Sequence, residues 1–312
     1  MRSVVPSSSR NGGVALRRAL LLAGAAALAP ALTAEAKAQT VVHAREGENQ
    51  GDVILGPGQD RLIVSLDRLA PSGTLNLGQS GSNAPVADSL DTGAGGHTLN
   101  LAATGAVTAN MINTPVSGFG RVVYEAYGRD SVLTLEDGVD AQGVRQIRTD
   151  TVYVGGDGTI NIVGDINTGG TTQQALVVDG FTTANHTGTG QGRLSLILSG
   201  AIVGGDADNP LIDAREAERV EVRNTIDISS GGALAFGSSD GGYLLVADGA
   251  RIRATNSTLA TEQEATLVYQ RGGLFENYGT LIEDGGAGEP GSERGKRAVG
   301  VELGSGTFHN RR

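Results

Sequence analysis

The aspartates are the residues of this chain whose type and spacing could support catalysis. A pair of carboxylates flanking a glycosidic bond can act as the acid and the base of its hydrolysis. The candidates are Asp88 with Asp91, and Asp206, Asp208 and Asp213 with Arg215. Aspartate is also an ordinary turn residue, because its side chain hydrogen-bonds the nearby backbone. These carboxylates are scattered, and only 4% of residues are aromatic, although enzymes that bind sugars usually stack them on aromatic side chains. We therefore favour the turn interpretation and predict no catalytic residue.

Metal and cofactor sites have equally little support in the sequence. Residues 155–158 (GGDG) and 204–208 (GGDAD) resemble single copies of a glycine–aspartate calcium repeat, which binds calcium only when several copies follow in tandem. The chain has no cysteine, which excludes thiol catalysis and cysteine-based metal centres. The histidines are His43, His97, His186 and His309, none at a metal-ligand spacing from another. We predict no metal and no cofactor.

Composition and charge limit the class of protein. Glycine accounts for 49 of 312 residues, tryptophan is absent, and 39% of residues are still hydrophobic. This combination favours many short aliphatic strands separated by glycine-rich turns. The formal net charge of -10 opposes binding to nucleic acids, whose phosphates would be repelled, and discourages self-association. The expected state is a monomer that could bind a cell-surface or polysaccharide ligand.

The N-terminal segment has the three parts of a secretory signal peptide. Four arginines and no acidic residue come first, and an apolar run of about 11 residues follows. This run is too short to span a membrane with confidence, which takes roughly 20 apolar residues. Ala36 and Ala38 form an A-x-A cleavage pattern. We therefore predict a signal peptide over 1–38. The Arg17-Arg18 pair leaves a twin-arginine route open beside the favoured Sec route.

Short stretches of alternating apolar and polar residues recur after the signal peptide, each bounded by Gly, Asp, Asn or Ser. They cover residues 53–55, 61–64, 74–77, 98–101, 132–135, 159–162, 194–197, 220–222, 243–246, 266–269 and 280–282. Several follow a glycine and are trailed by a second short apolar unit, such as 105–107 or 164–166. The main units return every 23 to 34 residues. A return at such intervals is typical of a solenoid.

The predicted fold is therefore all-β, a right-handed parallel β-helix (β-solenoid) following the signal peptide. Each coil would add short strands to the coil before it, and two inward residues per strand would build a narrow core. The domain limits are a leader or N-terminal cap over 39–52 and the β-helix over 53–312. A β-sandwich is the alternative, but it would need regular hairpin turns. Helix signals are confined to Asp213 to Val222 and Ser65 to Leu69.

The C-terminal segment 273–283 (GLFENYGTLIE) resembles the G-x-[VF]-x-N-x-G-T-I coil of autotransporter passenger domains. A second copy begins at Gly306, and 298–303 (AVGVEL) is similar to another strand of these repeats. In that family the asparagine sits at a coil corner and its amide bonds the backbone of stacked coils. The resemblance assigns this role to Asn277 and Asn310.

The resemblance implies export across the inner membrane and then translocation through a C-terminal outer-membrane β-barrel. No barrel-like region follows the repeats in this sequence, which leads us to expect a β-helix that is incomplete at its C-terminus. The expected function is a non-enzymatic passenger-type β-helix at the cell surface, in the outer membrane or outside the cell, or in the periplasm without a translocator. Its role would be adhesion or surface structure. The alternatives are a β-helix polysaccharide lyase or hydrolase and a nonfunctional fragment of a longer gene.

Overall fold

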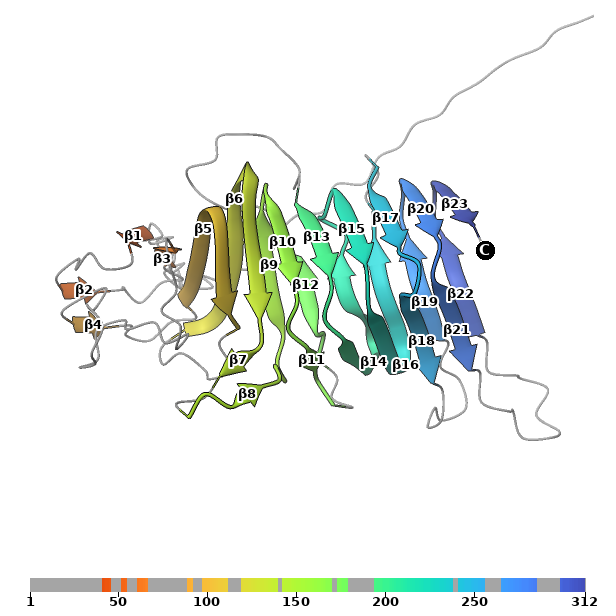
Figure 1. Cartoon of the computed structure of the whole chain (residues 1–312), viewed down its shortest axis with the longest axis horizontal. Coiled ribbons are helices and arrows are strands. Elements are labelled where there is room, and N and C mark those ends of the chain that lie inside the picture. The colour runs from red at the N-terminus through yellow and green to blue at the C-terminus, as the bar shows by residue number, and fades with distance from the viewer. Residues whose placement is uncertain are drawn as a thin grey trace, which may run out of the picture. The chain divides into compact units, whose positions relative to one another are not determined.

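The computed structural model (Figure 1) describes twelve stretches of the chain, all within one compact unit, Ala38–Arg312. They are residues 41–45, 52–54, 61–66, 89–91, 97–111, 119–139, 142–169, 173–178, 194–237, 241–255, 265–284 and 298–311. The predicted signal peptide, strand 74–77 and Asp88 lie outside them. Every element in the described stretches is a β-strand. No helix long and apolar enough to cross a membrane occurs in them.

The strands form three parallel ladders, and the coils from β10 to β22 contribute one rung to each of them. Ladder 1 contains the second halves of β5 (His97–Asn110) and β6 (Phe119–Glu136), then β10 (Thr159–Ile162), β13 (Ser195–Leu198), β15 (Arg219–Val222), β17 (Tyr243–Val246), β20 (Leu274–Asn277) and β23 (Thr307–Asn310).

Ladders 2 and 3 complete each coil. Ladder 2 contains β11 (Ile166–Asn167), the beginnings of β14 (Ile202–Ala214) and β16 (Thr225–Phe236), β18 (Arg251–Thr255) and β21 (Thr280–Asp284). Ladder 3 contains β1 (Val41–Arg45), β3 (Arg61–Leu66), the first halves of β5 and β6, β9 (Val152–Gly156), β12 (Leu176–Val178), the ends of β14 and β16, β19 (Ala265–Gln270) and β22 (Ala298–Leu303).

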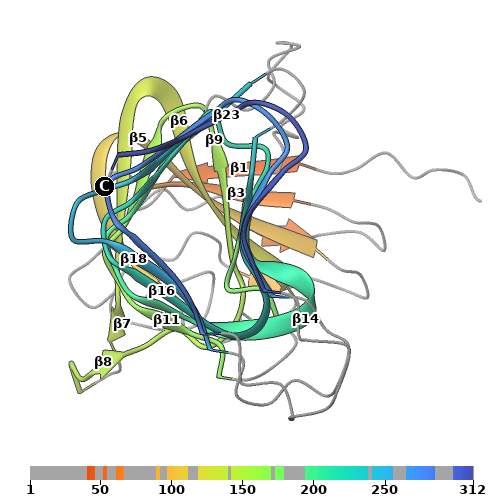
Figure 2. The same ribbon diagram turned by 90° about the vertical axis from the view of Figure 1, so that its right-hand side faces the viewer.

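Two small pairings lie outside the ladders. Strands β2 (Asp52–Ile54) and β4 (Ser89–Asp91) pair in parallel, and β7 (Gly138–Val139) with β8 (Arg145–Gln146) forms the one antiparallel pair among the described strands. Figure 2 shows strands of successive coils, such as β11, β16 and β18, lying one behind the other. The predicted parallel β-helix is confirmed, and the sandwich alternative is excluded by the parallel pairing.

The core consists of aliphatic columns that run from coil to coil. In ladder 1 one inward column contains Leu133, Ile160, Leu196, Val220, Leu244 and Phe275, all buried, in register from strand to strand. The strands alternate buried and half-buried positions, because successive side chains of a strand point to opposite faces. Toward the C-terminal coils aromatic rings enter the column. Phe275 packs at 6.1 Å from Phe236 and at 4.6 Å from Phe308, measured between ring centroids.

The coils differ in length about as much as the sequence suggested. Ser195 pairs with Arg219, a step of 24 residues, whereas Thr159 pairs with Ser195, a step of 36. The constant element is therefore the rung and the variable element is the connection, which agrees with a solenoid whose insertions lie in loops.

The helix expected over Asp213 to Val222 is wrong. Strand β14 ends at Ala214, a short turn follows, and Arg219–Val222 is strand β15. Val220 and Val222 pair with leucines of β13 and continue two core columns, so burial in the stack decides the conformation over the helix propensity of the Glu and Arg residues. In the second expected helix, Ser65 and Leu66 belong to strand β3, and the remaining residues lie outside the described stretches.

Candidate functional site

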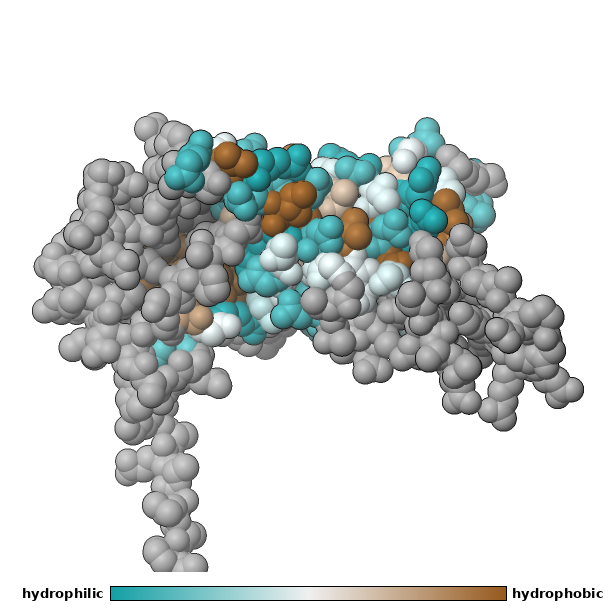
Figure 3. Space-filling model, turned by 90° about the horizontal axis from the view of Figure 1, so that it is seen from below, coloured by the Kyte–Doolittle hydropathy of each residue, from teal (hydrophilic) through white to brown (hydrophobic). Residues whose placement is uncertain are grey.

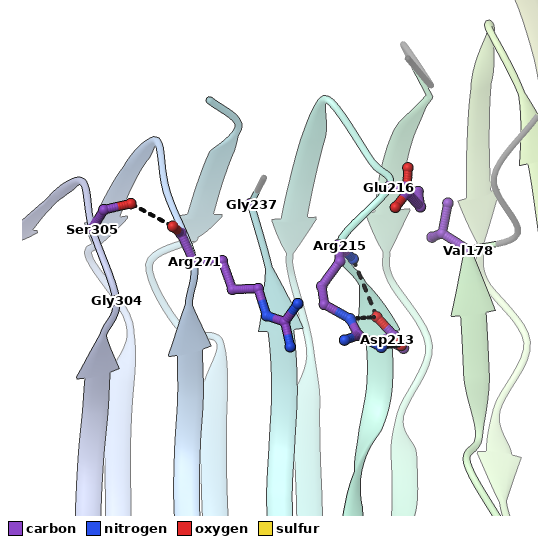
Figure 4. A pocket seen from close by; sticks show the side chains of 8 residues that line it. All are labelled: Val178, Asp213, Arg215, Glu216, Gly237, Arg271, Gly304 and Ser305. Atoms are coloured by element: carbon purple, nitrogen blue, oxygen red, sulfur yellow. Dashed lines mark hydrogen bonds and ion pairs between the residues drawn. The ribbon is translucent and has the colours of Figure 1, made fainter. Parts of the chain in front are cut away.

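A groove of about 760 Å³ follows the corner where the chain leaves ladder 3. Its lining comes from five successive coils and comprises Val178, Asp213, Arg215, Glu216, Gly237, Arg271, Gly304 and Ser305 (Figure 4). Strand neighbours in a sheet lie about 4.8 Å apart, so five rungs extend the groove over roughly 19 Å along the stack. A volume of this size lies in the range of small-ligand sites.

One column of this corner alternates arginine and glycine. Arg215, Gly237, Arg271 and Gly304 each directly follow the ladder 3 strand of their coil, and the strands end in register. The backbone continues this pairing, since the amide of Arg271 donates to the carbonyl of Phe236 at 3.0 Å. The two arginines therefore emerge two rungs apart, on either side of Gly237.

The backbone conformation and its close surroundings require glycine at position 237. Its φ is +80°, a conformation that side chains disfavour, and a Cβ there would overlap the carbonyl oxygen of Gly272 in the next coil. The close approach of the two coils accounts for this glycine without reference to a ligand. Because Gly237 has no side chain, the position between Arg215 and Arg271 in the groove is open.

Asp213 and Arg215 form an ion pair on one wall of the groove. Nε of Arg215 donates to Oδ1 of Asp213 at 2.6 Å, and its Nη2 contacts Oδ2. This hydrogen bond to the carboxylate is the main reason why the pKa of Arg215 is raised. The pair is partly buried, since the Asp213 side chain is 13% exposed. Asp213 is therefore engaged with Arg215 and does not stand as a free base.

Arg271 differs from Arg215 because its guanidinium makes no hydrogen bond or ion pair within the described part of the chain. Only its backbone is engaged, through the amide described above and through its carbonyl, which accepts a hydrogen bond from the hydroxyl of Ser305. In Figure 4 the Arg271 side chain extends over the strand of Gly237 toward Arg215, whereas Glu216 points away from both arginines.

The outer face of ladder 1 carries a second polar cluster, the tyrosine–glutamate network. Tyr243 donates from its hydroxyl to Glu276 at 2.9 Å, and Arg311 donates to the same carboxylate at 3.0 Å. The guanidinium of Arg219 lies 4.8 Å from the centre of the Tyr243 ring. Glu221 is held by Arg223 at 2.7 Å and by Arg219 at 3.3 Å. The network joins four coils through neighbouring outward positions.

Both glutamates of this network are held in their ionised form. The hydrogen bond from Arg223, followed by the charges of Arg223 and Arg219, lowers the pKa of Glu221. The hydrogen bonds from Tyr243 and Arg311 lower the pKa of Glu276. Glycosidase general acids need the opposite, a carboxyl whose pKa is raised. This network therefore has the properties of a charge-paired surface and lacks the acid that sugar cleavage requires.

The sequence candidates are distributed over separate places in the fold. Asp213 and Arg215 meet in the groove, as described. Asp206 and Asp208 lie in β14 and Asp91 lies in β4, for which the structure describes the backbone alone. Among the described residues no three His, Asp or Glu side chains gather closely enough to hold a metal ion. The candidate groups of three aspartates with Arg215, and of Asp88 with Asp91, are thus not assembled by any described side-chain contact.

The two glycine–aspartate segments lie largely in strands, since residues 155–156 end β9 and residues 204–208 belong to β14. Asp157 accepts a hydrogen bond from the amide of Gly128 in the preceding coil at 2.6 Å. A Cβ at Gly156 would overlap the backbone of Ala126, and one at Gly204 would overlap the Thr168 side chain. These positions are glycine because neighbouring coils approach closely, and the turn interpretation is wrong for residues 204–208, which pair as part of strand β14.

Asn277 and Asn310 stack at a coil corner, but not through the bond from the amide to the backbone of a stacked coil that the resemblance implied. The amide of Asn277 donates to the side-chain oxygen of Asn310 at 2.9 Å, and its own oxygen accepts from the amide of Gly279 at 3.1 Å. The bond between coils is thus side chain to side chain, and the backbone bond lies within the coil. Of the histidines, His97 is buried in β5 and His309 lies 3.7 Å from Glu276.

Sequence reasoning missed an aspartate column at the corner between ladders 1 and 2. Asp137 accepts from the amide of Asp165 at 2.7 Å, and Asp165 accepts from the amide of Ala201 at 2.7 Å. Arg145, in β8, reaches both carboxylates and lies 2.8 Å from that of Asp165. The aspartate beside a glycine in two successive second units, at 137–138 and 164–165, is the signal that could have located this column.

No family model matches the chain, and the comparisons with curated proteins and with solved structures returned no match either. The class of protein is therefore defined by the fold alone, a parallel β-helix with a charged groove at one corner.

Proposed function

We propose that this chain is an exported, non-enzymatic β-helix of the autotransporter passenger type with an adhesive or structural role at the cell surface or outside the cell. The observation that carries the non-enzymatic role is the state of its surface carboxylates. Glu221, Glu276 and Asp213 each have an arginine partner, and both glutamates have a lowered pKa. Such groups stabilise a surface and are poorly suited to donate a proton in catalysis.

The regular stack supports the same proposal. A β-helix satisfies its backbone between coils and buries an aliphatic core without large aromatic clusters, which suits a scaffold that presents its outer positions to a partner. On the face seen in Figure 3, hydrophilic residues predominate and the apolar residues form separate spots. A broad apolar contact patch is therefore not visible on the coloured part of that face.

Export is tested by the maturation of the full chain in a bacterial host. We expect the exported form to begin at Gln39, as measured by mass spectrometry of the extracytoplasmic fractions, and a matched chain that lacks 1–38 to stay in the cytoplasm. Replacing the arginine pair by Arg17→Lys and Arg18→Lys distinguishes the two export routes. Recovery of an unprocessed chain in the cytoplasm only would overturn the proposal.

A polysaccharide-cleaving enzyme is the second candidate, favoured by the presence of Asp213, Arg215 and Arg271 in one groove. Incubation of the protein with a panel of acidic and neutral polysaccharides, followed by assays of reducing ends and of unsaturated products, separates the two functions. We expect no product from the wild type. Cleavage that is lost in Asp213→Asn would establish the enzyme and exclude the non-enzymatic role.

A further inference from the structure

We propose that the groove binds a carboxylate-bearing sugar, with Arg271 and Arg215 holding the carboxylate over Gly237. This site is independent of the adhesive or structural role proposed above, because it stands on the groove alone. It goes beyond that role by naming a ligand class and the two side chains that recognise it.

The first argument is that the guanidinium of Arg271 has no carboxylate partner among the described residues, although Asp213 and Glu216 also line the groove. Arg215 contacts Asp213 through Nε and Nη2, which leaves its Nη1 without a bond to that carboxylate, and the charge of Glu216 also contributes to the raised pKa of Arg215. The guanidinium of Arg271 is directed toward Arg215 across the strand of Gly237, with no carboxylate drawn between the two (Figure 4). Like charges facing one another in this way are stabilised when an anion lies between them, and planar guanidinium groups match the geometry of a carboxylate.

The second argument is spacing. Residues that follow strands two rungs apart have backbones about 9.5 Å apart. This gap is too wide for the two backbones to touch, but long arginine side chains can reach one carboxylate from both sides. Gly237 keeps the intervening position open, since a side chain there would overlap Gly272.

The third argument concerns the remainder of the ligand. A single carboxylate fills little of about 760 Å³, and the rest of the wall offers Glu216, Gly304, Ser305 and backbone, with Val178 as the one apolar residue of the lining. A polar, hydroxylated body suits such a wall better than an apolar one. The net charge of -10 opposes densely charged polyanions, so the ligand should carry few charges. A uronic acid, as a monomer or within a sparsely charged glycan, meets these conditions.

The test is a ligand-observed NMR titration of the full chain with D-glucuronate, with methyl glucoside as the neutral analogue and inorganic sulfate as the second anion. We expect glucuronate to bind weakly, with a Kd of about 1 mM, and methyl glucoside not to bind. Arg271→Ala should weaken glucuronate binding about tenfold to a hundredfold, because it removes a charge-assisted hydrogen bond. Arg271→Lys should restore only part of the affinity, since the fork geometry is lost.

Arg251 provides the matched control, because it is exposed, stands on ladder 2, and its guanidinium also has no partner within the described residues. Arg251→Ala should leave the affinity unchanged. Asp213→Asn should tighten binding several-fold, since it releases Arg215 from a competing carboxylate. Equal affinities for wild type and Arg271→Ala, or equal losses in Arg271→Ala and Arg251→Ala, would overturn the site. Binding of sulfate without glucuronate would overturn the sugar acid as its ligand.

Discussion

Two corners of this β-helix handle charge in opposite ways. At the corner between ladders 1 and 2, the carboxylates of Asp137 and Asp165 accept backbone amides of the following coil and share Arg145. At the groove that follows ladder 3, Arg271 is left without a partner among the described residues, and a glycine stands where the next side chain would be. The first corner uses charge to join coils. The second leaves charge available to a ligand.

The largest difference between the corners should appear in their glycines. Gly237 at the groove and Gly249 at the corner between ladders 1 and 2 have nearly the same φ, +80° and +83°. Both Gly237→Ala and Gly249→Ala should lose about 1–2 kcal/mol to the left-handed backbone. At Gly237 the new methyl also meets the Gly272 carbonyl, whereas at Gly249 nothing lies within 4 Å. Gly237→Ala should therefore cost about 1–3 kcal/mol more, as expected for overpacking.

Chemical denaturation of the two variants against wild type measures this difference. Because long repeat arrays can unfold in more than one step, the comparison should use the transition of the C-terminal coils, followed by hydrogen exchange at the amide of Arg271. Equal losses of stability for the two substitutions would show that the coils at the groove can move apart. The open position at Gly237 between the two arginines would then not be rigid.

The second prediction concerns the aspartate column. Asp165→Ala removes the acceptor of the Ala201 amide, 2.7 Å away, and one partner of Arg145. Loss of a hydrogen bond to a charged acceptor should destabilise the protein by about 1–3 kcal/mol. Arg271→Ala should change stability by less than about 0.5 kcal/mol, because this exposed guanidinium has no partner to lose. Thermal unfolding of both variants, with amide exchange at Ala201, gives the comparison. A larger loss in Arg271→Ala than in Asp165→Ala would reverse the roles assigned to the two corners.

The sequence predicted the strands that follow a glycine with an apolar–polar–apolar pattern, as in 159–162, because two inward residues per strand are visible in a single chain. Most rungs of ladder 3 escaped it. Strand β12 reads Leu-Val-Val and β9 ends in two glycines, so neither shows a period of two. Their register comes from neighbouring coils, which one sequence does not reveal.

The groove was foreseen in part for the same reason. Asp213 and Arg215 are two residues apart and could be noticed together, whereas Arg271 is brought to them through pairings that skip a variable number of residues. Likewise, the aspartates 137 and 165 become a column only when Ile160 pairs with Leu133. The rungs are local in sequence, and the sites at the corners depend on coil length.

The smallest effect should be seen in the tyrosine–glutamate network, which extends the paired type of surface to the outer face of ladder 1. Burial, and next the hydrogen bond and charge of Glu276, raise the pKa of Tyr243 above its ordinary value of 10.0. The raised pKa favours the protonated phenol in the folded state, so this contribution to stability is complete below pH 10 and is lost as the pH rises through the folded pKa. The lowered pKa of Glu276 acts at the acidic limb of the stability profile, where stability is present above about pH 4.5 and is lost as the pH falls.

Glu276→Gln should therefore flatten both the acidic and the alkaline limb of the stability profile. It should also lower the pKa of Tyr243, while burial keeps part of the shift of that pKa. Spectrophotometric titration of the phenols, read as the difference between wild type and Tyr243→Phe, isolates this group from the other five tyrosines. An unchanged titration in Glu276→Gln would mean that the carboxylate and the phenol do not interact in solution, and the paired surface would then be confined to the aspartate column.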